Sequence, residues 1–256
     1  MDLALADKIA FVTGASGGIG LALTRAFAAE GARVVAHSRR GVPEGDAVLS
    51  TLGDVREPAS LEAAMRRAEE RFGRVDVCVV NAGIWPEGSL LLDELPEDRI
   101  REVMEVNLLG AIWTARAFFA SLRRTGPRAD GQGASLVFIG STAGRFGEAG
   151  HAEYAATKSA LRGLTLSLKN EIVTLDPRAR VNLVEPGWTV TPMAAATLAR
   201  DGSMDRVTRT MPLRQLASPD DVARAVLFLS SPSGARHVSG ETITVAGGME
   251  GRALWS

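Results

Sequence analysis

Residues Thr13-Gly14-Ala15-Ser16-Gly17-Gly18-Ile19-Gly20 decide how this chain folds. They end the apolar run Ile9–Thr13, which is typical of a buried strand, and lead directly into the helical pattern Gly18–Ala29. Glycines at the spacing Gly-x-x-x-Gly-x-Gly let the backbone turn sharply and approach a ligand closely. The first turn of the helix would add free N–H groups and partial positive charge. A strand, a glycine turn and a helix in this order predict a site for a dinucleotide pyrophosphate.

Apolar runs and helical patterns alternate along the rest of the chain. Buried strands are predicted at Ile9–Thr13, Arg33–His37, Ala47–Leu52, Asp76–Asn81, Ser135–Gly140, Arg180–Glu185 and Thr242–Ala246. Helices are predicted at about Gly18–Ala29, Ala59–Phe72, Glu97–Arg124, Ala152–Leu175 and Pro219–Leu229. The strands lack polar alternation, which is typical of a parallel sheet covered on both faces. We therefore predict an α/β fold, a doubly wound Rossmann-type parallel sheet of about seven strands with helices on both faces. It would form one domain over residues 1–256.

The segment after the second predicted strand bears on which dinucleotide is bound. Ser38–Asp46 is shorter than the dozen or more residues of a usual crossover, so we expect a loop in place of a helix. A site for NAD commonly has a carboxylate here, bonded to the ribose 2′-hydroxyl. This chain instead has Ser38, Arg39 and Arg40, and arginine can bind a 2′-phosphate through two charge-assisted hydrogen bonds. The pattern favours NADP(H) over NAD(H); the alternative is a pair of solvated arginines in an arginine-rich chain.

Bulk composition argues against several classes of function. The 256 residues carry a net charge of −1, so nothing indicates nucleic acid or an anionic membrane as a partner. No uninterrupted apolar run approaches the ~18 residues of a membrane helix, and the acidic start is atypical of a secretory signal. The three histidines lack metal-ligand spacing, so no catalytic metal is expected. The single cysteine, Cys78, cannot form an intrachain disulfide. We expect a cytoplasmic protein.

Tyr154 is the only tyrosine of the chain, and Lys158 follows it one helical turn later. Residues four apart share a helix face, with Cβ atoms about 5–6 Å from each other. A nearby ammonium can lower the phenol pKa from about 10. At ~4 Å, however, one charge supplies ~4 kcal/mol only where the effective dielectric constant is near 20. The pair therefore predicts an acid/base group in a partly desolvated cleft; the alternative is a stray pair on an ordinary amphipathic helix.

Ser141 follows the apolar run Leu136–Gly140, which places its hydroxyl at the carboxyl end of a predicted strand. Ligands bind at these ends in open α/β sheets. Hydride transfer to a carbonyl carbon leaves a developing alkoxide that needs a proton. Tyr154 could supply that proton while Ser141 holds the same oxygen by a hydrogen bond.

These residues together resemble a known family. Over nearly its whole length, the chain is similar to the short-chain dehydrogenases/reductases of the shorter type, which have roughly 250 residues. The resemblance is carried, in order, by Thr13–Gly20, Asp54-Val55, Asn81-Ala82-Gly83, Asn107, Ser141, Tyr154 with Lys158, and Pro186-Gly187 followed by Thr191. It implies an NAD(P)-dependent oxidoreductase that acts on CH–OH and C=O groups.

The resemblance also implies roles for individual residues. Ser141, Tyr154, Lys158 and Asn107 would be catalytic, with Asn107 completing a proton relay through water to Lys158. The cofactor would be bound by Gly14, Ser16, Gly18, Ile19, Gly20, Ser38, Arg39, Asp54, Val55, Asn81, Ala82, Gly83, Tyr154, Lys158, Pro186, Gly187, Thr189 and Thr191. The chain departs from the family pattern at Gly17, where many NADP-using members have a basic residue. It departs again at Glu185, where a small residue is more usual.

The substrate side of the site is less sharply defined. Trp85, His151 and Trp188 are predicted to lie near the substrate, and ordinary packing is the alternative for each. Residues 188–215 are mixed in character and are interpreted as a substrate lid. The helix around Val106–Leu122 is apolar on nearly every side, which indicates burial against another subunit. The resemblance points to a homotetramer formed through this helix and the one that carries Tyr154.

Three functions remain open at this point. The favoured one is an NADP(H)-dependent carbonyl reductase or alcohol dehydrogenase acting on a small molecule. The second is a 3-oxoacyl-[acyl-carrier-protein] reductase, for which basic residues should surround the pocket mouth to meet the acidic carrier protein. The candidates for that ring are Arg123, Arg124, Arg128, Arg178 and Arg180. The third, from a different class, is a non-catalytic NADP(H)-binding regulator; it ranks lowest because Ser141, Tyr154 and Lys158 are all present.

Overall fold

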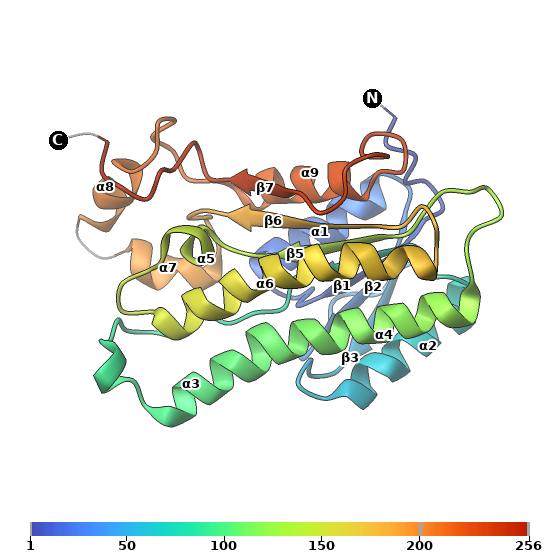
Figure 1. Ribbon diagram of the computed structural model, residues 1–256, viewed down its shortest axis with the longest axis horizontal. Helices are drawn as coiled ribbons and strands as arrows, with labels where there is room; N and C mark the ends of the chain where they lie inside the picture. The colour runs from blue at the N-terminus through green and yellow to red at the C-terminus, as the bar shows by residue number, and fades with distance from the viewer. Residues whose placement is uncertain (1, 200–201, 255–256) are drawn as a thin grey trace.

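The computed structural model describes residues 2–199 and 202–254, and seven parallel strands form its central sheet (Figure 1). The strands are β1 (Ile9–Thr13), β2 (Arg33–Ser38), β3 (Val48–Leu52), β4 (Val77–Val80), β5 (Ser135–Ile139), β6 (Arg180–Pro186) and β7 (Thr242–Val245). Every predicted strand is present, and no bound differs by more than one residue. The central strands are buried on both faces, which explains why their sequences lack polar alternation.

The strands are ordered β3-β2-β1-β4-β5-β6-β7, so the chain winds in both directions from β1. β1 pairs with β2 on one side and with β4 on the other. The carboxyl ends of β1 and β4 therefore flank the point where the strand order reverses, and open α/β sheets bind ligands at this point. The arrangement confirms the predicted doubly wound fold.

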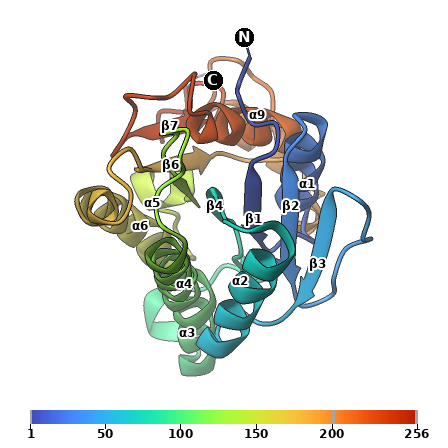
Figure 2. The ribbon, with the colours of Figure 1, turned by 90° about the vertical axis from the view of Figure 1, so that its right-hand side faces the viewer.

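Helices cover the sheet on both faces (Figure 2). One face carries α1 (Gly18–Ala29) and α9 (Pro219–Ser230), and the other carries α2 (Pro58–Phe72), α4 (Gly110–Thr125) and α6 (Ala152–Glu171). Each group buries its apolar side chains against the sheet, which gives two separate hydrophobic cores. The described residues 39–47, between β2 and β3, contain no helix, as the short connection predicts.

The helix predicted over Glu97–Arg124 is interrupted. It consists of α3 (Glu97–Met104), a π-helical turn at Glu105–Leu109, and α4. π-Turns are rare and often mark functional positions. This one contains Asn107, which is buried. By length and composition alone, Glu97–Thr125 could cross a membrane, but half of its most apolar 18-residue window is buried inside the molecule, as in a core helix.

Three short helices were not predicted, because each is too short to show a clear apolar period. They are α5 (Thr142–Phe146), α7 (Pro192–Leu198) and α8 (Ser203–Thr208). Local signals for two of them are present in the sequence. The backbone N–H of Ala143 donates to the Ser141 hydroxyl at 3.1 Å, which caps α5. Thr191 caps α7 in the same way, with Pro192 at the first helical position. Figure 1 shows all three helices at the end of the sheet to which the strands point.

Candidate active site

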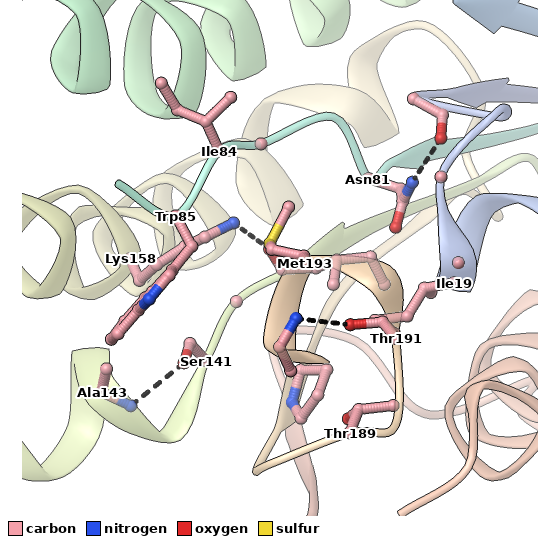
Figure 3. A pocket seen from close by; sticks show the side chains of 18 of the residues that line it. Ile19, Asn81, Ile84, Trp85, Ser141, Ala143, Lys158, Thr189, Thr191 and Met193 are labelled. Carbon is pink, nitrogen blue, oxygen red and sulfur yellow. Dashed lines mark hydrogen bonds between the residues drawn. The ribbon is translucent and has the colours of Figure 1, made fainter. Parts of the chain in front are cut away.

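A cavity opens at the carboxyl edge of the sheet, where the strand order reverses, and most of the predicted site residues line it (Figure 3). Those are Gly14, Gly18, Ile19, Gly20, Asn81, Ala82, Gly83, Trp85, Ser141, Tyr154, Lys158, Pro186, Gly187, Trp188, Thr189 and Thr191. Figure 3 shows Trp85, Ser141 and Lys158 at one end, and Ile19, Asn81 and Thr191 at the other. The glycine loop and the tyrosine–lysine pair therefore belong to one cavity, although they are far apart in the sequence.

The glycine loop is held tightly against the start of α1. A Cβ atom on Gly20 would lie 2.2 Å from the carbonyl oxygen of Gly14, so only glycine allows this turn. A Cβ on Gly18 would lie 2.9 Å from Thr191, which crosses over the loop. Gly17 is the N-cap of α1 and has no side chain to occupy the first N–H groups of the helix. Those donors face a cavity with room for a phosphate, as dinucleotide binding requires.

Asn81 and Ala82 fix the carboxyl end of β4 against that of β1. Both backbone N–H groups donate to the Thr13 hydroxyl at 3.1 Å, and the Asn81 amide donates to the Thr13 carbonyl oxygen at 2.9 Å. A Cβ on Gly14 would lie 2.8 Å from the Ala82 Cα. This network brings the two strand ends together and shapes the middle of the cavity.

The residues predicted for the adenosine end lie beyond the cavity walls. Ser38 ends β2 and is buried, and its hydroxyl is without a hydrogen-bond partner in the part of the chain that the structure describes. Arg39 follows it on the exposed surface. Asp54 is held by Arg56 at 2.7 Å, and this hydrogen bond lowers the pKa of the Asp54 carboxyl. Val55 is buried beneath Gly110 of α4, where a Cβ on that glycine would lie 2.7 Å from its methyl group.

Lys158 and Asn107 converge behind Gly83. A Cβ on Gly83 would lie 3.3 Å from both the Lys158 Nζ and the Asn107 Oδ1. Lys158 donates to the carbonyl oxygen of Ile139 at 2.9 Å. Asn107 accepts from the Ile84 N–H at 2.8 Å and donates to the Ile84 carbonyl at 2.9 Å, so the π-turn holds this amide firmly. The sequence did not predict the π-turn. This turn directs the Asn107 side chain to the backbone of Ile84 beside the cavity.

Tyr154 is buried among apolar groups. Its ring packs with Val103, Ala143, Ile84 and Trp85. The Lys158 Nζ lies 5.8 Å from the centre of the ring, so the two side chains share one helix face as the i,i+4 spacing predicts. Ser141 lies at the end of β5 on the same cavity wall. A phenol, a hydroxyl and an ammonium therefore meet at one end of a cavity whose other end is the glycine loop.

Known proteins share this arrangement. A family model described as Enoyl-(Acyl carrier protein) reductase matches residues 14–250. The chain is 34% identical over 252 residues to the 3-oxoacyl-[acyl-carrier-protein] reductase FabG of Vibrio cholerae, covering 96% of this chain and 98% of the relative. It is 33% identical over 249 residues to the protein of the same name from Escherichia coli, covering 94% and 97%. The structure of a 3-ketoacyl-(acyl-carrier-protein) reductase from Brucella melitensis, complexed with NADH, matches with a TM-score of 0.85 and 29% identity. That match covers 96% of this chain and 99% of the other.

The chain belongs to the short-chain dehydrogenase/reductase family. It is therefore an NAD(P)-dependent oxidoreductase that acts on C=O and CH–OH groups. The residues present fit a dinucleotide by two independent features. A Cβ on Gly20 or Gly18 would collide with the loop backbone or with Thr191, so glycine is needed for the turn before α1, and the buried Ser38 hydroxyl lacks a partner among the described residues.

Burial controls the electrostatics of this short-chain dehydrogenase/reductase. It raises the pKa of Tyr154 to about 12; the neighbouring Ser141 hydroxyl opposes this rise, and the charge of Glu148 adds to it. Burial also lowers the pKa of Lys158 to about 8. The net shift of the Tyr154 pKa is therefore upward, opposite to the direction expected from Lys158, because burial disfavours the phenolate.

The three aromatic residues predicted near the substrate have different positions. Trp85 and Trp188 line the cavity, with ring centres 6.1 Å apart, and Trp85 meets Tyr154 edge-on at 4.7 Å. His151 lies behind Trp85, stacked on it at 3.9 Å, and is buried. Arg99 contacts the His151 Nδ1 at 3.3 Å and pairs with the buried Glu153 at 2.7 Å. His151 therefore supports the cavity wall, while Trp85 forms its surface.

Backbone hydrogen bonds outside the sheet tie the start of the segment 188–215 to the residues that follow its end. The Val190 N–H donates to the Ala217 carbonyl at 2.9 Å, and the Ala217 N–H donates to the Trp188 carbonyl at 3.1 Å. Between these anchors, Met193 and Ala194 of α7 reach the cavity wall. Residues 200 and 201, which fall within the predicted lid, lie outside the described residues.

The arginines proposed to surround the pocket mouth lie at the opposite edge of the sheet. Arg180 starts β6, is buried, and donates to the carbonyl oxygens of Leu229, Ser230 and Ser231 at the end of α9. Arg124 lies in the last turn of α4 and pairs with Glu69 at 2.7 Å, and Arg128 pairs with Asp76 at 3.2 Å. These residues precede strands, whereas the cavity lies where the strands end. The predicted basic ring is therefore wrong for these residues within one subunit.

Glu185, the unusual residue before Pro186, faces α6. It is buried, and its Oε1 lies 3.0 Å from Arg162 on that helix, one turn beyond Lys158.

In the part of the chain that the structure describes, no group of three or more His, Cys, Asp or Glu side chains is placed to hold a metal ion.

Proposed function

We propose that this protein is an NADP(H)-dependent oxidoreductase that transfers hydride between nicotinamide and a small carbonyl or secondary alcohol substrate, with Tyr154 as the acid/base. One observation carries the proposal. Tyr154, Ser141 and Lys158 line the same cavity as the glycine loop, and the walls near them are largely apolar apart from Glu148. A small, largely apolar cavity with a few convergent polar groups is typical of a small-molecule site.

The roles of the chain's residues follow from their positions. The nicotinamide cofactor, when bound, supplies or accepts the hydride. Tyr154 gives its phenolic proton to the substrate oxygen during reduction, and Ser141 donates a hydrogen bond to the same oxygen. Lys158 stabilises the phenolate that Tyr154 becomes, and water held near Asn107 and Lys158 returns the proton. Pro186, Gly187, Thr189 and Thr191 hold the nicotinamide end, and the glycine loop holds the pyrophosphate.

The protonation state of Tyr154 follows from its burial in the cavity. With its pKa raised to about 12, Tyr154 stays protonated at neutral pH, which suits its role as the acid in carbonyl reduction. For alcohol oxidation the phenolate must form, and the positive charges of Lys158 and of an oxidised nicotinamide ring would both favour it. We infer that reduction is the favoured direction near neutral pH.

The preference for NADP(H) rests on the end of β2. Ser38 offers a buried hydroxyl without a partner in the described chain, and Arg39 follows it on the surface. Together they present a donor and a positive charge to a 2′-phosphate. Asp54 is already engaged by Arg56, so its charge is partly neutralised at this end of the site.

Further parts of the proposal concern assembly and dynamics. Residues 188–215 act as a lid over the substrate within a single domain of 1–256. Copies of the chain associate as a homotetramer through α4 and α6; Leu109, which ends the π-turn before α4, and Leu166 of α6 are exposed there. A reducing compartment such as the cytoplasm suits the buried free thiol of Cys78.

A second candidate function is 3-oxoacyl-[acyl-carrier-protein] reduction. It is favoured by the relatives of that name, which share 33–34% identity over nearly the whole chain. The position of the five arginines does not favour it, because they lie at the far edge of the sheet and four of them are engaged by carboxylates or carbonyl oxygens. A non-catalytic NADP(H)-binding regulator is the weakest candidate, since it would have no need for Ser141, Tyr154 and Lys158 in one cavity.

One experiment separates these candidates. NADPH oxidation is followed at 340 nm with simple ketones, diketones and acetoacetyl thioesters, with and without a carrier protein, and repeated with NADH. We expect turnover of free ketones, with NADPH preferred. Turnover only of carrier-bound substrate would favour the second candidate. Tight NADPH binding without any turnover would revive the regulator, and a clear preference for NADH would contradict the cofactor assignment.

A further inference from the structure

Glu148 is a charged side chain of the cavity that the chemistry above does not use. It lies between α5 and α6 and forms part of the wall that also contains Tyr154. Across the described residues, its carboxylate forms no hydrogen bond and no ion pair. The other acidic groups near this end, Glu153 and Glu185, are each paired with an arginine. Glu148 differs from them in facing the space that a substrate would fill.

The surroundings of Glu148 disfavour the negatively charged form of its carboxyl group. Partial burial raises the pKa of its carboxyl, and the charge of Arg206 on α8 opposes that rise without forming an ion pair. The charge of Glu148 is also felt by Tyr154, so the carboxylate lies close to the reacting end of the cavity. A partly desolvated carboxylate without a counter-ion is unfavourable, and a positively charged ligand would remove that penalty.

The neighbouring walls are suited to the same kind of ligand. Trp85 and Trp188 line the cavity beside Tyr154. The ring plane of Trp85 lies at 68° to that of Trp188 and at 78° to that of Tyr154. The rings therefore form angled walls and not a stack. Angled aromatic walls attract an ammonium group through their π-electrons, most strongly where water is excluded, and a carboxylate beside them adds a full opposite charge.

Resting on the proposed function, we propose that the substrate carries a positively charged ammonium group near its carbonyl, and that Glu148 with Trp85 and Trp188 binds that group. Glu148 then determines substrate specificity without touching the reacting atoms. It would disfavour ketones that carry a carboxylate at the same place, because two negative charges would meet in a partly desolvated cavity.

Binding of a cation that cannot react tests the site directly. Benzyltrimethylammonium is titrated calorimetrically into the NADP⁺-saturated enzyme, into Glu148→Gln, and into Glu87→Gln, which removes an equal charge from an exposed position outside the cavity. We expect binding to weaken at least tenfold in Glu148→Gln and to stay within twofold in Glu87→Gln. No binding to the wild-type enzyme, or equal binding to Glu148→Gln, would overturn the inference.

Turnover of two ketones of the same shape then separates this inference from the proposed function. Phenacyltrimethylammonium carries the charge, and 3,3-dimethyl-1-phenylbutan-1-one replaces its nitrogen by carbon. Because the ammonium group activates the neighbouring carbonyl in any enzyme, the deciding quantity is the ratio of the two kcat/KM values. We expect Glu148→Gln to lower this ratio at least tenfold. Turnover of both ketones with an unchanged ratio rejects the substrate class and leaves the proposed function intact. Failure of both, with NADPH still bound, counts against the proposed function, and the calorimetric result still decides the role of Glu148.

Discussion

The Nζ of Lys158 lies 5.8 Å from the centre of the Tyr154 ring, and its hydrogen bond goes to the carbonyl oxygen of Ile139. The ammonium is thus held by the end of β5 and not by the phenol. From this position it can act on the phenolate through its charge while staying in reach of water beside Gly83 and Asn107. In the proposed function Tyr154 acts as the acid and Lys158 as its electrostatic support, and the backbone at the end of β5 fixes the position of Lys158.

Tyr154→Phe should remove nearly all turnover. The ring still fills its apolar site, so packing is kept, and only the proton donor is lost. General acid catalysis contributes about 10²- to 10⁴-fold, and kcat should fall by at least that lower figure. The Kd for NADPH, measured by fluorescence titration, should change less than twofold. Retained turnover would reject Tyr154 as the acid/base.

Lys158→Met should alter the pH dependence of stability. The folded-state pKa of Lys158 is lowered to about 8 by burial, so between pH 8 and its ordinary value of 10.5 the unfolded chain binds more protons than the folded one. Stability therefore rises with pH across this window in the wild type, and this contribution is absent from the variant. The difference in free energy of unfolding between the two proteins should grow by about 2 kcal/mol between pH 7.5 and pH 10. Urea unfolding at fixed protein concentration measures it, and a difference that is flat with pH would contradict the buried ammonium.

Arg39→Ala should weaken the preference for NADPH. Arg39 follows Ser38 at the carboxyl edge of β2, whereas Arg40 lines a separate surface groove with Arg67 and is the matched control. A charge-assisted hydrogen bond to phosphate is worth about 1.5–3 kcal/mol, so the ratio of kcat/KM for NADPH over NADH should fall about 10- to 100-fold. Arg40→Ala should leave that ratio within threefold. Equal losses in both variants would place the 2′-phosphate elsewhere.

The sequence predicted the sheet well because a buried parallel strand is specified locally. Runs such as Ile9–Thr13 are apolar at every position, and no other part of the chain is needed to interpret them. The π-turn around Asn107 depends on a contact with Ile84, which lies 23 residues away, and no local pattern announces it. The predicted direction of the Tyr154 pKa shift was wrong for a similar reason. The sequence places an ammonium nearby, but it does not show how deeply both groups are buried.

Gly20→Ala should damage the cofactor site, while Gly163→Ala should not. A Cβ on Gly20 would lie 2.2 Å from the Gly14 carbonyl oxygen and 2.7 Å from the Ala15 Cα, so the backbone of the loop must move. Gly163 lies in the exposed middle of α6, where a Cβ meets nothing within 4 Å. We expect at least a tenfold weaker Kd for NADPH in Gly20→Ala. Gly163→Ala should keep that Kd and gain about 0.5–1 kcal/mol in free energy of unfolding from better helix propensity. Normal NADPH binding by Gly20→Ala would show that the loop tolerates opening.

Arg162→Leu should destabilise the protein through Glu185. The carboxylate is only 2% exposed, and its Oε2 has no partner among the described residues, so Arg162 supplies its compensating charge. Removing one partner of a buried pair costs about 3–5 kcal/mol, and the lower end applies because Arg162 is 46% exposed. The double variant Arg162→Leu/Glu185→Ala should recover most of the loss, since no charge is left buried. A loss that is equal in the single and double variants would show that Arg162 acts through packing and not through its charge.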